Sequence, residues 1–125
     1  MDIEIKDPIE ISMDVLEIDE HLPSMKFTII INVRETYYSM AISSEIWVEC
    51  SVFDAFVNSL KRKNKATLID MDNLFQLVIE PTQLAWCCSK INLDGRLIQG
   101  LGEASLTNDI QQKILDVFED YPKWW

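Results

Sequence analysis

Glycine, proline and histidine are scarce in this chain of 125 residues, which contains three, four and one of them. Three glycines cannot build the glycine-rich loops that hold nucleotide phosphates, so Walker-type and dinucleotide-binding motifs are excluded. The single histidine, His21, has no second histidine at zinc-ligand spacing and no serine elbow to activate. The sequence therefore lacks the patterns of common catalytic centres, and we expect a protein that is not an enzyme and binds no cofactor.

Disulfide bonds and membrane-spanning segments are not indicated either. The three cysteines are odd in number, and Cys87 and Cys88 are adjacent. Neighbours on a strand point to opposite faces, so this pair is unsuited to holding one metal ion. The apolar stretch at 27–31 has the length of a strand, and the acidic N-terminal residues do not resemble a secretory signal. We expect reduced thiols, no metal, no membrane segment and a cytoplasmic protein.

Negative charge is what the chain has in excess. It contains 21 Asp and Glu against 11 Lys and Arg, which gives a formal charge of −10 and a pI near 4.4. Because 48% of the residues are hydrophobic and 10% are aromatic, the chain can bury enough surface to fold. An acidic body repels phosphate backbones and anionic membranes and attracts basic proteins. We expect a single domain over residues 1–125 that binds a basic protein, with no nucleic acid or membrane partner.

Alternation of apolar and polar residues predicts strands in the first half of the chain. The alternation that starts at Ile9 changes phase at Val15 and Leu16, which predicts a bulge. Residues 21–24 form a turn pattern. Further strands are expected at 25–33, 38–42 and 46–48.

After residue 50 the apolar residues recur at the spacing of a helix. Phe53, Phe56, Val57 and Leu60 form one apolar stripe, which predicts a helix near 52–62 with Ser51 as its N-cap. A second helix is expected near 108–119, beginning at Thr107 and Asp109.

Between the helices, strands are expected at 66–69, 74–79, 84–93 and 96–106, with Asp94-Gly95 as a hairpin turn. The order of elements has no βαβ rhythm. It predicts an α+β fold, mainly an antiparallel sheet of about six to eight strands with two helices.

The aromatic residues divide between core and surface. Trp47 and Trp86 fall within strand patterns and are expected in the core. Trp124 and Trp125 are expected to dock onto the body of the protein, although an exposed pair would be a binding anchor. Tyr37 and Tyr38 straddle a turn, so at least one should face solvent.

Gly100 and Gly102 share one face of their strand. A bulky neighbour that crosses them, or a sharp bend of the sheet, would explain this spacing.

The first twenty residues contain eight carboxylates and one lysine, and they are the strongest candidate for a binding surface. A negative strip along a sheet edge would contact a basic partner, with the two tyrosines beside it. The alternative is a solvated strip that keeps the edge from pairing with other chains. The candidate partner-binding residues are Glu10, Asp14, Glu17, Asp19, Glu20, Tyr37 and Tyr38.

The segment 44–49, followed by Phe53, Phe56 and Leu60, resembles the W-V…F-x-x-F-x-x-x-L core of WapI-like bacterial immunity proteins. The order of elements over 25–120 is similar to theirs. The resemblance implies a cytoplasmic protein that neutralises a cognate toxin delivered by a neighbouring cell, and it provides no catalytic residues. A basic nuclease is one such toxin, and its charge agrees with the acidic composition.

Two other functions stay open from the residues. A small enzyme or ligand-binding domain could use the sheet as a pocket floor, with Trp86, Cys88, Gly100 and Gly102 as its lining. An acidic DNA mimic could present carboxylates in place of phosphates.

Overall fold

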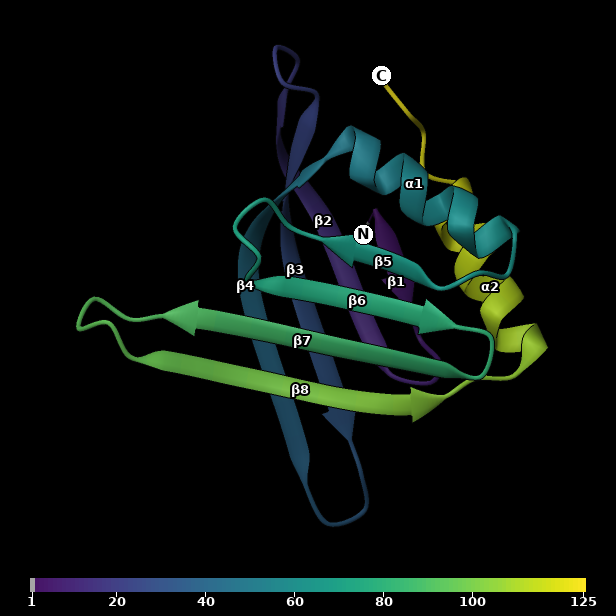
Figure 1. Cartoon of the computed structure of the whole chain (residues 1–125). Coiled ribbons are helices and arrows are strands. Elements are labelled where there is room, and N and C mark those ends of the chain that lie inside the picture. The colour runs from purple at the N-terminus through teal and green to yellow at the C-terminus, as the bar shows by residue number, and fades with distance from the viewer. Residues whose placement is uncertain (1) are drawn as a thin grey trace.

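The computed structural model describes residues 2–125, which form two four-stranded antiparallel sheets and two helices (Figure 1). This confirms the predicted α+β class. Both sheets have their strands in sequence order. Sheet A contains β1 (Ile3–Ile5), β2 (Glu10–Asp19), β3 (Ser24–Arg34) and β4 (Ser39–Glu49), and sheet B contains β5 (Ala66–Ile69), β6 (Phe75–Glu80), β7 (Gln83–Ile91) and β8 (Leu97–Ser105). Helix α1 (Cys50–Lys61) joins the two sheets, and α2 (Asn108–Glu119) follows β8.

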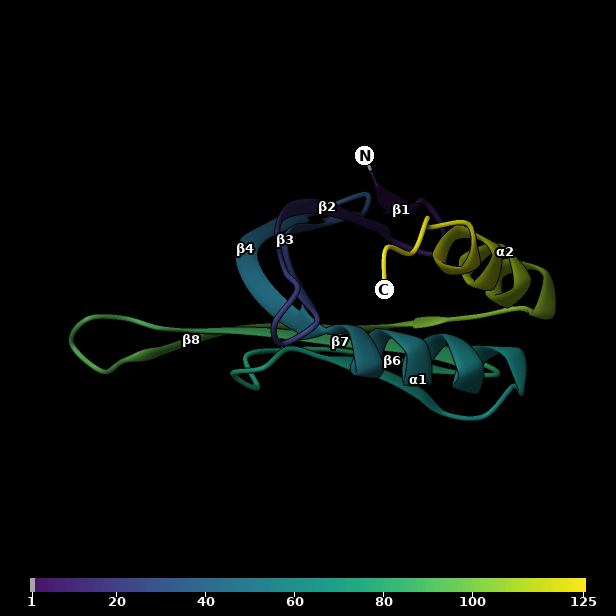
Figure 2. The same cartoon turned by 90° about the horizontal axis from the view of Figure 1, so that it is seen from above.

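The two sheets face each other across a shared core. Sheet A curves over sheet B, with its strands running across those of sheet B, and the helices close one side (Figures 1 and 2). Alternate residues of each strand point inward, as a period of two requires. The largest fully buried side chains come from both sheets and both helices, and they include Phe27, Phe53, Phe56, Phe75 and Phe118.

Sheet A contains the predicted bulge. Strand β2 pairs with β3 along its length, and the register shifts between Val15 and Glu17. The strands predicted at 38–42 and 46–48 are wrong as separate elements, because β4 is continuous and pairs with β3 from Ser39 to Glu49. The polar residues between them obscured the alternation without interrupting the backbone pairing.

The two helices begin differently. Helix α2 begins as predicted, with the Thr107 hydroxyl accepting a hydrogen bond from the Ile110 N–H at 3.3 Å. The prediction of Ser51 as N-cap of α1 is wrong: the N-cap is Glu49, which makes no side-chain capping bond. The chain passes directly from β4 into α1, and the Cys50 N–H donates to the Pro23 carbonyl at 2.8 Å. A turn of sheet A thus takes the place of a side-chain cap.

The two central tryptophans occupy different environments. Trp86 is buried, as predicted, and lies against Gly102, where an added Cβ would be 2.7 Å from the indole Nε1. At Gly100 an added Cβ would collide with the Ile42 side chain of sheet A. The prediction that Trp47 belongs to the core is wrong. It follows buried Ile46 on the strand, so it points to the outer face of sheet A, where it is half-buried.

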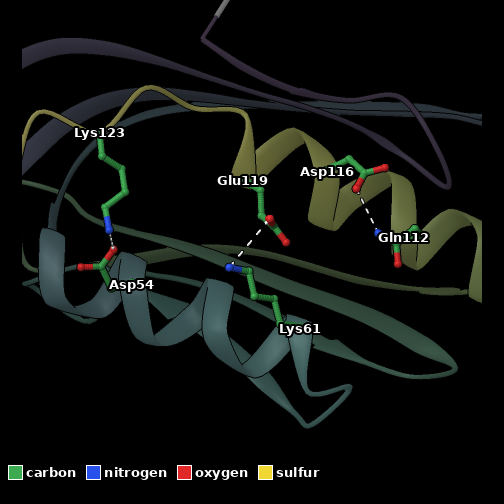
Figure 3. A network of polar contacts seen from close by, with 6 residues as sticks. All are labelled: Asp54, Lys61, Gln112, Asp116, Glu119 and Lys123. Atoms are coloured by element: carbon green, nitrogen blue, oxygen red, sulfur yellow. Dashed lines mark hydrogen bonds and ion pairs between the residues drawn. The ribbon is translucent and has the colours of Figure 1, made fainter.

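The C-terminal residues fold back onto α1, which confirms the predicted docking of Trp124 and Trp125. The Trp125 Nε1 donates to the Asp54 carboxylate at 2.9 Å, and the ring of Trp125 packs edge-on against Phe53. Figure 3 shows Lys123 reaching the same carboxylate, at 2.6 Å. We call this contact of Lys123 and Trp125 with Asp54 the C-terminal clasp.

The clasp changes the acidity of Asp54. Burial on its own would raise the pKa of the carboxyl, but the hydrogen bonds from Lys123 and Trp125 and the charge of Lys123 outweigh it. The pKa of Asp54 is therefore lowered. An ion pair between the two helices, Lys61 with Glu119 at 3.8 Å, lies beside the clasp (Figure 3).

Candidate protein-interaction surface

Carboxylates from two strands meet on the outer face of sheet A. The register places Asp14 of β2 and Glu45 of β4 on either side of Thr28 of β3. Directly opposed residues share a face. Glu10 lies opposite Asn32, and beyond the bulge Glu17 lies opposite Lys26. Asp19 and Glu49 flank Ser24 in the same way. We define the acidic face as the carboxylates Glu10, Asp14, Glu17, Asp19, Glu45 and Glu49. Glu45 and Glu49 were not predicted as site residues, and their membership depends on a strand register that the sequence does not display.

Two cations lie among these carboxylates. Lys26, in the middle of the sheet, is 3.6 Å from Glu17 and 3.4 Å from Glu45. Arg34, at the end of β3, is 3.9 Å from Glu10. Six carboxylates against two cations leave the face negative. Ion pairs between exposed side chains contribute little to the stability of the fold. The net negative charge of the acidic face is therefore available to attract a partner.

Two of the predicted site residues also hold the backbone. The Asp19 carboxylate accepts hydrogen bonds from the His21 N–H at 2.9 Å and from the Leu22 N–H at 3.3 Å, which shapes the turn after β2. The Asp14 carboxylate accepts from the Asp2 N–H at 3.0 Å. Their charge contributes to the acidic face while their positions are set by the fold.

A pocket of about 270 Å³ lies at one end of the acidic face. Trp47 forms part of its wall together with Leu22 and Met71, which are 49% and 43% exposed. Asp19 and Asp72 add carboxylates to the lining. Aromatic side chains and methionine are enriched in binding interfaces, so Trp47 and Met71 are the residues of this lining that fit a binding site. We call this site the Trp47 pocket.

A hydrogen-bonded loop positions the far wall of the Trp47 pocket. The buried Asp70 carboxylate accepts from the N–H groups of Leu74 and Phe75, each at 2.8 Å. The Met71 N–H donates to the Trp47 carbonyl at 2.8 Å, which ties the loop to β4. The sequence offered one signal for this site, because Trp47 stands out of phase with Ile46 and Val48 on the same strand.

The predicted tyrosines lie away from the Trp47 pocket. Tyr37 and Tyr38 are 97% and 62% exposed in the turn between β3 and β4. Glu20 is exposed in the turn between β2 and β3, at the opposite end of β3. Of the predicted residues, the structure places Glu10 at the tyrosine end of the face and Glu17 and Asp19 at the pocket end. The seven residues therefore do not form one compact site.

The space expected for a pocket on the sheet is filled. Trp86 and Cys88 are buried, and the room beside Gly100 and Gly102 is occupied by Ile42 and Trp86. Burial also raises the pKa of the Cys88 thiol, and the charge of Cys87 adds to this. These four residues do not line a cavity for a ligand.

A shallow groove of about 430 Å³ lies between β1 and α2. Ile5, Ile110 and Ile114 are among its apolar lining residues, and Lys6 and Lys113 are among its charged ones.

Two features are absent from residues 2–125. These residues contain no group of three or more His, Cys, Asp and Glu placed to hold a metal ion. Neither helix in this part of the chain is long and apolar enough to cross a membrane.

Comparison with protein-family models, curated proteins and solved structures found no match to this chain.

Proposed function

We propose that this protein is a non-enzymatic binding protein that neutralises a cognate toxin, in the manner of the WapI-like immunity proteins that its sequence resembles. One observation carries the proposal. The acidic face places six carboxylates on one side of sheet A, next to the Trp47 pocket. Charge and an aromatic anchor are thereby combined on a single surface.

The two parts of this surface have different physical roles. The carboxylates attract a basic partner from a distance and raise the rate of association, an effect that salt screens. Trp47, Leu22 and Met71 provide apolar area that a partner side chain can bury, which slows dissociation. A basic nuclease fits both roles, because an enzyme that binds nucleic acid carries a positive surface.

The test is binding to the product of the neighbouring gene, measured by surface plasmon resonance, together with survival of cells that express both. We expect a stable complex and protection from the toxin. Raising the salt concentration from about 50 to 500 mM should lower the association rate at least about tenfold.

A double charge reversal locates the interface. Glu17→Lys with Glu45→Lys should slow association at least about tenfold. The matched control, Glu80→Lys with Asp120→Lys, makes the same change of net charge at exposed residues outside sheet A. Equal losses in both variants would show that net charge matters and the acidic face does not. A neighbouring gene product that is harmless or fails to bind would contradict the function itself.

A further inference from the structure

Strand β8 is the outermost strand of sheet B, and within residues 2–125 nothing pairs with its far side. Two hydrogen bonds show which of its backbone groups are free. The Asn92 N–H donates to the Arg96 carbonyl at 2.8 Å, and the Leu106 N–H donates to the Thr82 carbonyl at 2.9 Å. Both bonds point toward β7, and pairing between them is regular.

Hydrogen bonds alternate along an antiparallel strand. Since residues 96 and 106 bond toward β7, the even-numbered residues between them do so as well. The odd-numbered residues therefore turn their N–H and C=O groups to the open edge. These residues are Leu97, Gln99, Leu101, Glu103 and Ser105.

The other strand edges of the two sheets are short, lie beside a helix or carry more charge. Strand β1 has three residues, and α1 lies along β5 (Figure 1). Strand β4 carries Glu45 and Glu49, and the Met71 N–H donates to the Trp47 carbonyl at its edge. Strand β8 has nine residues, no proline and one charged residue, Glu103. Natural edge strands are commonly blunted by charge, proline or short length, and β8 has little of this protection.

Apolar side chains add to the open edge. Leu97, Ile98 and Leu101 are 59%, 59% and 64% exposed. The hairpin of β7 and β8 extends beyond the area that sheet A covers (Figure 2). Exposed apolar groups next to unpaired backbone groups form a template for another strand.

We propose that a second copy of this chain occupies the edge, with the two β8 strands pairing antiparallel about a two-fold axis at Leu101. This register joins sheet B of one copy to sheet B of the other as one continuous sheet. It uses all five residues whose N–H and C=O groups point to the open edge. Leu101 then faces Leu101 of the second copy, and Leu97 faces Ser105. Isologous pairing of this kind is the commonest symmetry of protein dimers.

The distribution of charge favours a second copy at this edge. Two molecules of formal charge −10 repel each other, but β8 carries a single carboxylate. In this register Glu103 faces Gln99 and not another Glu103, so no like charges are directly opposed. Arg96 directly precedes β8, Lys90 of β7 lies opposite Ile98, and the acidic face lies on the outer side of the other sheet.

Sedimentation velocity over a range of protein concentrations tests the proposal. We expect the wild-type chain to form a dimer, and we expect added salt to strengthen it because salt screens repulsion between the two acidic copies. Leu101→Lys places two ammonium groups opposite each other and should weaken the dimer at least about tenfold. The control Leu16→Lys adds the same charge at an exposed leucine of sheet A and should leave the dimer intact.

A backbone variant makes the test specific. Leu101→Pro removes an N–H that points to the open edge and spares the bonds to β7, so it should abolish the dimer while circular dichroism stays unchanged. Should either variant misfold, hydrogen exchange on the wild type decides: the Leu101 amide should be protected at high protein concentration and exchange rapidly on dilution.

A monomer at about 1 mM protein, or a dimer that Leu101→Lys leaves intact, would overturn the proposal. The opposite response to salt separates this proposal from the proposed function, because toxin binding should weaken with salt while self-association strengthens. Each can therefore fail without the other.

Discussion

The two sheets have the same number of strands and the same sequential order, but they expose different chemistry. Residues 1–49, which include sheet A, contain 11 of the 21 carboxylates and three of the 11 cations. Sheet B contains the exposed apolar hairpin at Ile91–Leu101. Their inner faces, in contrast, contribute to one core. Burial makes the inner faces alike, while the outer faces remain free to differ.

The largest effect is expected from replacing the tryptophan of each sheet, because Trp86 of sheet B is buried and Trp47 of sheet A is on the outer face. Trp86→Ala leaves a cavity beneath Gly100 and Gly102, so we expect it to lower the free energy of unfolding by about 4 kcal/mol. Trp47→Ala removes a half-buried side chain of the outer face of sheet A and should cost about 1 kcal/mol. Urea denaturation followed by circular dichroism measures both, and equal losses would show that the two environments are the same.

A smaller loss of stability is expected from a substitution beside Trp86 in sheet B. Gly102→Ala puts a Cβ within 2.7 Å of the Trp86 Nε1, and we expect a loss of about 2 kcal/mol from overpacking. In a Trp86→Leu background the same substitution should cost much less. A double-mutant cycle measures this coupling. Additive losses would mean that the indole does not set the need for glycine.

The C-terminal clasp belongs to neither sheet and provides a reference for surface charge. Asp54→Asn should lower the free energy of unfolding at pH 7 by about 1 kcal/mol, a modest value because the carboxylate is partly exposed. Since the folded pKa of Asp54 is lowered, its contribution is present above the unfolded value near 4 and is lost as pH falls through the folded pKa. Urea unfolding of both proteins at several pH values should show the difference shrinking in acid. A constant difference would contradict the role of ionisation.

The smallest effect is expected on the acidic face. Lys26→Met removes the cation between Glu17 and Glu45, and we expect a loss of about 0.5 kcal/mol from unrelieved repulsion. In about 1 M salt the loss should disappear, because the repulsion is screened. A loss that persists in salt would point to packing of the lysine stem. Thermal unfolding with and without salt distinguishes the two.

Sequence patterns predicted the elements that local periodicity defines. Helix α2 begins and ends where its apolar stripe and the Thr107 cap indicate, and the bulge follows from the phase change at Val15. Residues that depend on distant partners were harder to place. Ser51 has the composition of an N-cap, but the Pro23 carbonyl from a turn of sheet A takes the Cys50 N–H instead.

The candidate surface shows the same limit. The carboxylates of β2 were visible as a run in the sequence, whereas Glu45 and Glu49 join them only through the register of β4 on β3. Trp47 was assigned to the core because a tryptophan within a strand pattern is often buried. Its phase relative to Ile46 was the better guide, since strand neighbours point to opposite faces.

The contact of Ile42 with Gly100 constrains how the halves of the molecule move. A methyl group of β4 occupies the place where any larger residue of β8 would have its Cβ. Sliding one layer past the other would force this methyl over the β8 backbone, which close packing resists. The proposed toxin on one sheet and the proposed second copy on the other would accordingly be held at a fixed angle to each other.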